Sequence, residues 1–491
     1  YEIADRDWSS DVCSSDLGFT EMNIILPLIW TSMAVLAAFA IGVVIFAYTR
    51  KGLKWCILLG GLFILVQVVR HFDFLPNMVQ EYVVKPNEFS KERPYIKNNI
   101  QGTLDAFGLS EVQTREYEVE RLPWTVVTPQ VEESIRNIPV WDRELLVAVY
   151  EQLQGIRPYY DFQGIDVDRY IVRGLYQQVY LSAREINLKK LPGYAKSWIN
   201  RHLQYTHGYG MVMTPAAQGG GDVMTWYIQD IPPKSNYGLT VKRPAIYYGL
   251  REQPYVVAPN DVGEMDYPQG EESVSTNYAG TGGVAISSLF RKAIFAAYFR
   301  DKKIFLTTKV NNESRILFRR GIVERIQTLT PFLRLDDDPY VVTTDQGVFW
   351  IQDAYTVSDQ YPYAASHKTG FNYIRNGAKI VVDAYNGTVT YYISDEGDPI
   401  IRAYARMYPG LLKDMKEMPA ELQPHVRYPK DLFKIQMDMY TKYHQTDPEI
   451  FYREEDIWDY AKVKGKKGQI DMDPYYITLS LIERDQHEFL L

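Results

Sequence analysis

Two long apolar segments lie close together near the start of the chain, and mixed-polarity sequence follows them. The first, 24–48, holds 25 residues without a charge, and the second runs from 55 to 75 with its first charge at Arg70. At 1.5 Å per residue, a 25-residue helix extends about 37 Å, which exceeds the roughly 30 Å of a hydrocarbon core. The pattern predicts a transmembrane hairpin within 18–80, ahead of a large region, 86–491.

The link between these segments sets the expected orientation. Residues 49–54 contain three basic residues and no acid, so the positive-inside rule places the link in the cytoplasm. We therefore expect a multi-pass protein of the cell membrane whose C-terminal region is extracytoplasmic. Arg70 and Asp73 are three residues apart on one helical face. This spacing would let them pair inside a helix bundle, or Arg70 can extend to the interface, which we favour.

The first residues differ from the rest. Residues 7–17 read DWSSDVCSSDL, are poor in apolar side chains, and resemble the in-frame translation of a sequencing adapter. We predict that 1–17 is a non-native leader and that native sequence starts near Gly18. It is also no signal peptide, because it lacks a basic start followed by a short apolar core.

Beyond the hairpin, apolar residues recur at helical spacing in some stretches and alternate in others, with Gly and Pro between them. The predicted helices are 92–108, beginning near Pro94, and 131–137, 143–155, 192–205, 287–299, 319–328, 400–408 and 430–444. The predicted strands are 112–119, two within 157–178 continued by 180–185, an irregular β-rich region over 211–276, and 340–344, 348–353, 380–385, 389–393 and 475–481.

These elements predict an α+β fold with antiparallel strands. The best hairpin signal is Asn386-Gly387 between two apolar runs, since Asn-Gly suits a two-residue turn. Such a tight hairpin argues against a doubly wound parallel sheet. An internal boundary of the large region is expected near Gly210 or Gly280.

Composition narrows the class of function. The net charge of −8 argues against a nucleic-acid partner. The two cysteines are Cys13 and Cys56, so the large region has neither a disulfide nor a cysteine metal site. The count of 39 Tyr suits either buried strand pairs, which we favour, or an exposed surface for sugar or peptide.

Several long segments resemble uncharacterised protein family 0182, a family of large bacterial integral membrane proteins. They are PNEFSKERPYIKNNIQGTLDAFGL at 86–109, WDRELLVAVYEQLQGIRPYYDFQGIDVDRY at 141–170, RHLQYTHGYG at 201–210, RILFRRGIVERI at 315–326 and DLFKIQMDMYTKYHQTDPEIFY at 431–452. The resemblance implies further membrane helices upstream and an outer domain that continues past 469–491. The chain thus looks like a fragment whose partners include the bilayer and those missing helices. The resemblance implies no catalytic residue.

The sequence gives only weak signals for a metal site. His202 and His207 are five residues apart, whereas helical zinc pairs are four apart with an acid nearby. We therefore expect buried, hydrogen-bonded histidines and no metal or cofactor. The run 336–338, three aspartates, lacks the spacing of a calcium loop and is predicted to be a solvated turn.

Two further candidates concern anions and acid catalysis. Gly280, Gly282 and Gly283 precede the predicted helix 287–299 and could present N–H groups to an anion, although a structural turn is favoured. Asp353 and Asp359 lie beside aromatic residues and would be glycosidase-like only if folding brought them within about 5–10 Å.

Two functions are compatible with these observations. Because no catalytic motif is found, we favour a non-enzymatic membrane protein that binds or scaffolds a component of the cell envelope. The alternative is an envelope-processing enzyme acting on glycan or lipid. A cleft with converging carboxylates of raised pKa would favour the enzyme.

Overall fold

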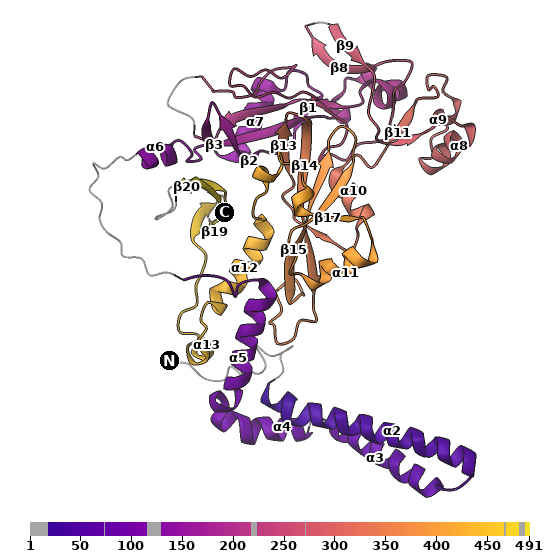
Figure 1. Ribbon diagram of the computed structural model, residues 1–491, viewed down its shortest axis with the longest axis vertical. Helices are drawn as coiled ribbons and strands as arrows, with labels where there is room; N and C mark the ends of the chain where they lie inside the picture. Colours follow the sequence, from indigo (N-terminus) through magenta and orange to yellow (C-terminus); the bar gives the residue numbers. More distant parts are fainter. Residues whose placement is uncertain are drawn as a thin grey trace. The chain divides into compact units, whose positions relative to one another are not determined.

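The computed structural model describes residues 18–72, 74–114, 129–217, 223–270, 272–465, 468–480 and 487–491 (Figure 1). The leader 1–17, Asp73 and most of the predicted strand 112–119 lie outside these residues, and 112–114 form no strand. The chain forms two compact units. The first comprises 1–115, 357–374 and 435–472, and the second comprises 116–356, 375–434 and 473–491. Gly210 and Gly280 both fall inside the second unit.

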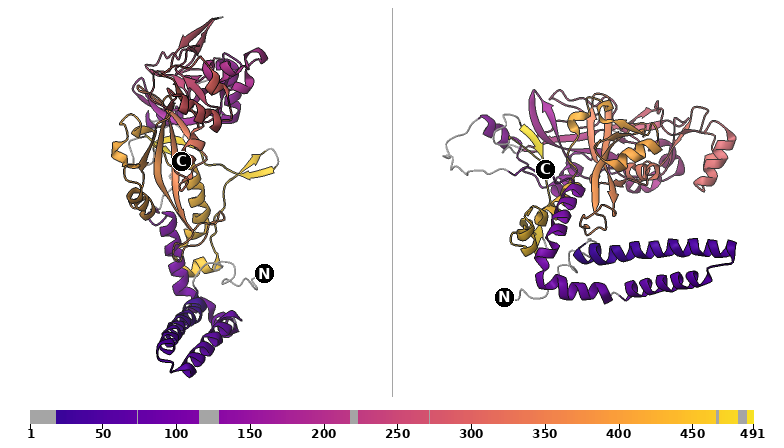
Figure 2. Two further views of the ribbon diagram at one scale, coloured as in Figure 1. Left: turned by 90° about the vertical axis from the view of Figure 1, so that its right-hand side faces the viewer. Right: turned by 60° about the horizontal axis from the view of Figure 1, so that its bottom comes forward.

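The first unit begins with two apolar helices that lie side by side (indigo in Figure 2). They are α2, Leu26–Thr49, preceded by η1, Glu21–Ile25, and α3, Leu53–His71. The spans 21–49 and 53–71 are long and apolar enough to cross a membrane. Only 6% and 11% of the residues in the most apolar stretch of each are buried. This exposure distinguishes them from core helices and indicates membrane association. Arg50 and Gly52, with φ of 56° and 95°, reverse the chain between them.

A second group of helices continues the first unit. It comprises α4, Phe74–Val79, the short turns η2, Gln80–Val84, and η3, Lys85–Asn87, and then α5, Glu88–Phe107. The predicted start of α5 near Pro94 is wrong, because Pro94 lies inside the helix, on its exposed side. There the carbonyl group that loses its amide partner can meet water. The predicted stop is confirmed, since Gly108 takes φ 69° and caps the helix.

Helix α5 is packed by parts of the chain that come far later. Asn99 Oδ1 accepts a hydrogen bond from Tyr443 Oη at 2.9 Å, and Gln436 Nε2 donates to Phe107 O at 2.8 Å. These partners belong to α12, Lys430–Tyr443, and α13, Pro448–Arg453, also contacts α5. The first unit also includes the hairpin of β18, Lys462–Gly465, and β19, Gly468–Asp471, and the segment 357–374, whose Phe371 packs beside Phe107 of α5.

The second unit contains a small antiparallel sheet beside helix α7. The helices are α6, Pro129–Ile135, and α7, Arg143–Gln154, and the strands are β1, Tyr160–Phe162, β2, Asp166–Val172, β3, Leu175–Ile186, and β5, Met211–Pro215. Strand β3 pairs with each of the other three. Tyr150 of α7 is fully buried against this sheet and donates to Tyr180 O at 3.2 Å.

A larger sheet has the order β12-β14-β15-β16-β17, with β13 also on β14 (Figure 1). The strands are Arg334–Leu335, Tyr340–Thr344, Gly347–Ser358, Tyr373–Asp383, Val389–Ile393 and Leu412–Asp414 for β12 to β17. Strands β12 and β13 pair with β14, and β15 pairs with β16, in antiparallel fashion, whereas β16 and β17 are parallel. The predicted α+β fold and the Asn386-Gly387 hairpin are therefore confirmed. Ile380 and Val382 join one core cluster, which includes residues of α10, Ile322–Leu329, and α11, Pro399–Met407, and Val381 joins another.

Short strands and turns fill the remainder of the second unit, as the irregular pattern over 211–276 predicts. They are β4, Gly208–Tyr209, β6, Ala245–Ile246, β7, Val256–Ala258, β8, Glu264–Gln269, β9, Glu272–Thr276, β10, Val284–Ala285, β11, Arg315–Leu317, β20, Ile477–Ser480, and β21, His487–Leu490. The helices here are α8, Leu289–Tyr298, and α9, Lys303–Leu306, with the short turns η4, Leu188–Lys190, η7, Met415–Glu417, and η8, Gln423–His425.

The predicted helix 192–205 is only partly right. The segment forms a short turn, η5, Gly193–Ala195, and then a separate helical stretch over 198–204 that includes η6, Asn200–Gln204. Ser197 Oγ accepts the N–H of Asn200 at 3.2 Å and starts a new turn, so the helix cannot run through. Leu203 is fully buried, whereas Tyr194 is 89% exposed.

Candidate functional site

Two cavities of the second unit meet at Arg143, the first residue of α7. The helix starts there because the Asp142 carboxylate accepts the N–H groups of Glu144 and Leu145 at 2.8 and 3.1 Å. Arg143 lines both cavities, which have volumes of about 440 and 410 Å³. Its Nε and Nη2 donate to Ile165 O at 3.0 and 2.6 Å. The guanidinium is thereby held in one orientation, with further N–H groups left for other acceptors.

The larger cavity is aromatic. Its lining includes Trp141, Tyr180, Tyr475 and Tyr476. Tyr180 Oη donates to Trp141 O at 3.2 Å and Tyr476 Oη donates to Tyr428 O at 2.7 Å, so both phenols are bonded within the fold. Trp141 and Tyr475 remain 37% and 52% exposed. We call this the aromatic cavity, since its open rings suit flat, partly apolar groups.

The smaller cavity is lined by carboxylates. Asp166 comes from the start of β2, and the run Asp336, Asp337 and Asp338 comes from the loop before β13. One Asp166 oxygen accepts the N–H of Val341 at 2.9 Å. The predicted solvated turn at 336–338 is only partly right: Asp337 is exposed, whereas Asp336 is buried. We call this the acidic cavity.

Hydrogen bonds fix Asp336 and Asp338 of the acidic cavity. Asp336 accepts the N–H groups of Asp338 at 2.8 Å and Asp431 at 3.1 Å, and also the Tyr355 hydroxyl. Asp338 accepts Arg427 Nη2 at 2.7 Å. The acidic cavity is therefore a set of oriented carboxylates.

Burial changes the protonation of two of these acids. It raises the pKa of Asp166 to about 7, against the opposing effect of the Arg427 charge. It raises the pKa of Asp336 to about 6, although the hydrogen bond from Tyr355 lowers it. Near neutral pH the Asp166 carboxyl group therefore spends much of its time protonated, when it can donate as well as accept a hydrogen bond.

Arg427 links the walls of the two cavities. Its guanidinium lies 3.8 Å from the ring centre of Tyr340 and 4.5 Å from that of Tyr476, which lines the aromatic cavity. Nη1 donates to Val167 O at 2.9 Å, and Nη2 pairs with Asp338 of the acidic cavity. The two cavities thus share supporting residues as well as Arg143.

The histidines singled out from the sequence lie in neither cavity lining. His202 Nδ1 is 2.7 Å from Tyr255 O and its ring stacks on Tyr255, while burial lowers its pKa. His207 is completely buried, with Nδ1 2.8 Å from Thr206 Oγ1 and Nε2 3.3 Å from Asp266. Burial opposes its charge, but hydrogen bonds to Asp266 and Glu264 raise its pKa. Within the described part of the chain, no three His, Cys, Asp or Glu residues are placed to hold a metal ion.

The two aspartates singled out as glycosidase-like differ in setting. Asp353 is buried in the second unit, where it forms an ion pair with Lys379 and accepts Asn376 Nδ2 at 2.9 Å. Asp359 belongs to the first unit, where it is exposed.

The glycine turn is engaged by its own chain. The Thr281 N–H donates to Asn386 Oδ1 at 3.0 Å and the Gly282 N–H donates to Tyr278 Oη at 2.8 Å. Strand β10 follows Gly283, so Gly280, Gly282 and Gly283 do not directly precede helix α8. The local contacts are those of a structural turn.

Sequence reasoning singled out the run 336–338 of the acidic cavity but missed Arg143, Asp166 and the aromatic lining residues. Asp166 and Asp168 alternate along one strand in a run that is otherwise apolar or basic, and both are buried. That pattern is a signal, because an acid at a core position needs a partner or a function. Asp168 has a partner, His425 Nδ1 at 2.7 Å, whereas Asp166 faces the acidic cavity.

Comparison with known proteins gives a family without an assigned activity. The model of the Uncharacterised protein family (UPF0182) matches residues 8–491. A UPF0182 protein of Nitrosococcus oceani is 51% identical, over 96% of this chain and 56% of its own length. Those of Syntrophobacter fumaroxidans and Methylococcus capsulatus are 50% and 44% identical, over 96% and 94% of this chain and 55% and 54% of theirs. The chain spans about half the length of these relatives. No solved structure matches it.

Proposed function

Because this chain belongs to the uncharacterised protein family UPF0182, whose name assigns no activity, we propose a function from its geometry. It is a membrane-associated protein whose second unit binds a glycan of the cell envelope in the aromatic and acidic cavities around Arg143. This proposal specifies the binding role that the sequence favours.

The observation that carries the proposal is the pairing of two unlike cavities on either side of one immobilised arginine. A sugar ring has apolar C–H faces and a rim of hydroxyl groups that both donate and accept. The open faces of Trp141 and Tyr475 suit the C–H faces, and the carboxyl groups of Asp166 and Asp336 suit the hydroxyl groups. Both volumes fall within the range of ordinary ligand sites.

Charge supports a neutral, hydroxyl-rich ligand over a simple cation. The pKa of Asp166 is raised to about 7, so this carboxyl group is only partly charged at neutral pH, whereas Asp336, with a pKa of about 6, keeps most of its charge. Arg143 and Arg427 add positive charge at the walls. The aromatic cavity would also add little binding energy for a cation unless the cation lay over the face of a ring.

The proposed location rests on the two apolar helices and their basic link. The link, with Arg50, Lys51 and Lys54, supports a cytoplasmic turn, and the second unit then lies on the outer side, where envelope glycans occur. Further membrane helices of the longer relatives are proposed partners of this hairpin, because the chain spans about half their length.

A glycan-processing enzyme is a second candidate, favoured by one observation. Asp166 and Asp336 line the same cavity and both have raised pKa values, as a general acid working near neutral pH requires. In this reading Asp166 would donate a proton to the glycosidic oxygen as its bond to the anomeric carbon breaks, and water would supply the new hydroxyl group at that carbon.

The test uses the whole chain in detergent micelles. Thermal unfolding is followed with wall-glycan fragments, lipid head groups and divalent cations, and we expect glycan alone to raise the midpoint by several degrees. Trp141→Ala and Tyr475→Ala should each weaken glycan binding about fivefold or more. Tyr194→Ala is the matched control, since Tyr194 is an exposed tyrosine of the same unit that lines neither cavity.

Two results would overturn the binding proposal: no shift with any glycan, or equal weakening by Tyr194→Ala and Tyr475→Ala. Asp166→Asn separates the two candidates. If the protein only binds glycan, neither the parent nor the variant releases reducing ends. If it is an enzyme, the parent releases reducing ends and the variant binds glycan without releasing them.

A further inference from the structure

Helices α8 and α9 of the second unit present apolar side chains to solvent. Leu289 and Phe290 are 70% and 74% exposed. We call the exposed apolar residues, together with the basic residues beside them, the α8–α9 surface. Its apolar members are Leu289, Phe290, Ile294, Tyr298, Phe305 and Leu306.

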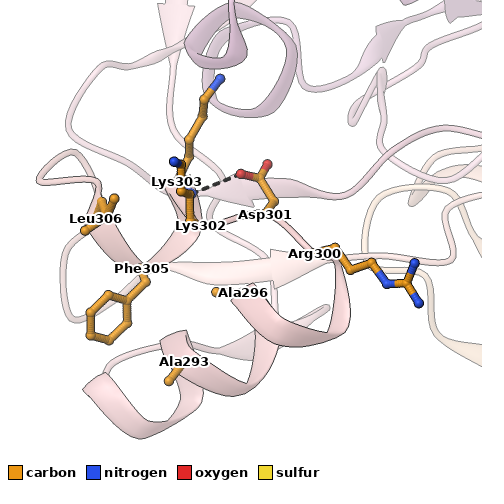
Figure 3. Close-up of a pocket in the computed structure, with 8 residues that line it drawn as sticks. All are labelled: Ala293, Ala296, Arg300, Asp301, Lys302, Lys303, Phe305 and Leu306. Atoms are coloured by element: carbon orange, nitrogen blue, oxygen red, sulfur yellow. Dashed lines mark hydrogen bonds between the residues drawn. The ribbon is translucent and has the colours of Figure 1, made fainter.

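A groove of about 690 Å³ runs between these two helices (Figure 3). Ala293 and Ala296 of α8 lie along one side, and Phe305 and Leu306 of α9 lie along the other. The small alanine side chains leave room between the larger apolar groups. The α8–α9 surface is thus an apolar groove with projecting rims.

Basic residues are frequent in this part of the chain, and Arg300, Lys302 and Lys303 line the groove. Residues 284–310 contain six Lys or Arg and one acid, within a chain of net charge −8. The acid, Asp301, accepts Trp198 Nε1 at 2.7 Å, Tyr255 Oη at 2.6 Å and the Lys303 N–H at 3.0 Å. Its charge is therefore directed into the fold, and the exposed charges of the α8–α9 surface are positive.

The helix that carries this surface is fixed to the unit by its other face. Phe295 and Phe299 pack in a core cluster, and their rings lie 5.8 and 6.0 Å from that of Phe318. Ser288 Oγ caps the first turn by accepting the Arg291 N–H at 3.2 Å. The exposed residues are therefore held in place by a packed helix.

We propose that the α8–α9 surface docks on an anionic phospholipid bilayer. Apolar side chains of α8 and α9 enter the level of the head groups, while Arg291, Lys292, Lys302 and Lys303 bind lipid phosphates. The argument is charge complementarity joined to exposed apolar area, in a chain that already carries two membrane-length helices. This inference does not depend on glycan binding.

A second copy of the chain fits this surface less well. In a two-fold dimer the same patch meets itself, which would bring the basic side chains of both copies together. A bilayer containing anionic lipid has the opposite charge and accepts apolar side chains at the same time. The dimer is nevertheless an outcome that the experiment distinguishes.

The test attaches an environment-sensitive dye to a cysteine at position 290 of the whole chain. The variant is Phe290→Cys with Cys13→Ser and Cys56→Ala, reconstituted into vesicles of phosphatidylcholine with or without about 30% phosphatidylglycerol. We expect a blue shift and quenching by lipid-borne quenchers only with the anionic lipid. Tyr194→Cys with the same dye is the control, and its spectrum should not respond to lipid composition.

Charge removal and salt complete the test. Each of Lys302→Gln and Lys303→Gln should reduce the apparent affinity for the anionic surface about fivefold, and about 0.5 M salt should weaken it further. The proposal is overturned if the dye at position 290 reports the same environment in both lipid mixtures. A blue shift in detergent that grows with protein concentration would also overturn it, in favour of a dimer.

Discussion

Asp353 and Asp166 are both buried acids of the second unit, yet their surroundings are opposite. Asp353 is in direct contact with the buried amine of Lys379 and also accepts an N–H from Asn376. Among the described residues Asp166 forms no ion pair, and the nearby Arg427 is paired with Asp338. Burial accordingly raises the pKa of Asp166 to about 7.

The difference distinguishes an acid that stabilises the fold from an acid that can act on a ligand. A buried acid with its own cation is satisfied by the fold and has no need of a ligand. A buried acid without one stays sensitive to protons and to any hydroxyl group that enters its cavity. Asp353, singled out from the sequence, is of the first kind, and Asp166, which sequence reasoning missed, is of the second.

The largest expected effect comes from breaking the Asp353 pair. Lys379→Met leaves the Asp353 charge buried without its cation and should lower the free energy of unfolding by about 3–5 kcal/mol. Urea unfolding of the whole chain in detergent measures this. Lys379→Met combined with Asp353→Leu should recover most of the loss, and a double variant as unstable as the single one would contradict the pairing.

Asp166→Asn should change how stability depends on pH. Because the folded-state pKa of Asp166 is raised to about 7, the folded protein holds this proton more tightly than the unfolded chain does. The stability that this proton gives is fully present below about pH 4 and is lost as pH rises through 7. The total loss should be a few kcal/mol at most. Asparagine cannot ionise, so the variant should be more stable than the parent above pH 7 and similar at pH 4.

Unfolding midpoints at several pH values compare the two proteins. Asp336, whose pKa is raised to about 6, should still cause some loss of stability in the variant as pH rises. Parallel curves for parent and variant would show that Asp166 is not protonated near neutral pH.

Tyr355→Phe should have an intermediate effect, because Tyr355 donates to Asp336 and accepts the Leu432 N–H at 3.2 Å. Losing this hydroxyl should cost about 1–3 kcal/mol. The pKa of Asp336 should also rise further, since the tyrosine hydrogen bond lowers it. Thermal unfolding at pH 5 and pH 8 tests both statements, and a loss that is equal at the two pH values would contradict the second.

The smallest effect is expected for Asp337→Asn. Asp337 lines the same cavity as Asp166 but is exposed, so its charge is solvated. The free energy of unfolding should change by less than about 0.5 kcal/mol. A larger loss at pH 7 would place Asp337 among the structural acids, which its exposure does not suggest.

Local signals in the sequence predicted most elements. The Asn386-Gly387 turn fixes its hairpin because the residues that decide it are adjacent, and Gly108 ends α5 for the same reason. The amphipathic pattern of 192–205 predicted too long a helix because Ser197 starts a new turn within it. Apolar spacing alone contains no information on such a local hydrogen bond.

The cavities could not be predicted in the same way. Their lining joins Arg143, Asp166, Asp336 and Tyr475, which are brought together by pairings between distant strands. The acid at 166 could be noticed as unusual, but its lack of a cation depends on where Arg427 and Lys379 lie. The two long apolar helices were accessible from sequence because length and apolarity alone define them.

The first unit has a consequence for the order of synthesis. Helix α5 ends at Phe107, whereas α13, which contacts it, begins at Pro448. At about 5–20 residues per second, a ribosome needs roughly 20–70 s to produce the intervening chain. During that time the face of α5 that contacts α13 lacks this partner, although Phe371, which packs beside Phe107, is made earlier. The first unit can therefore be completed only after most of the second unit has been synthesised.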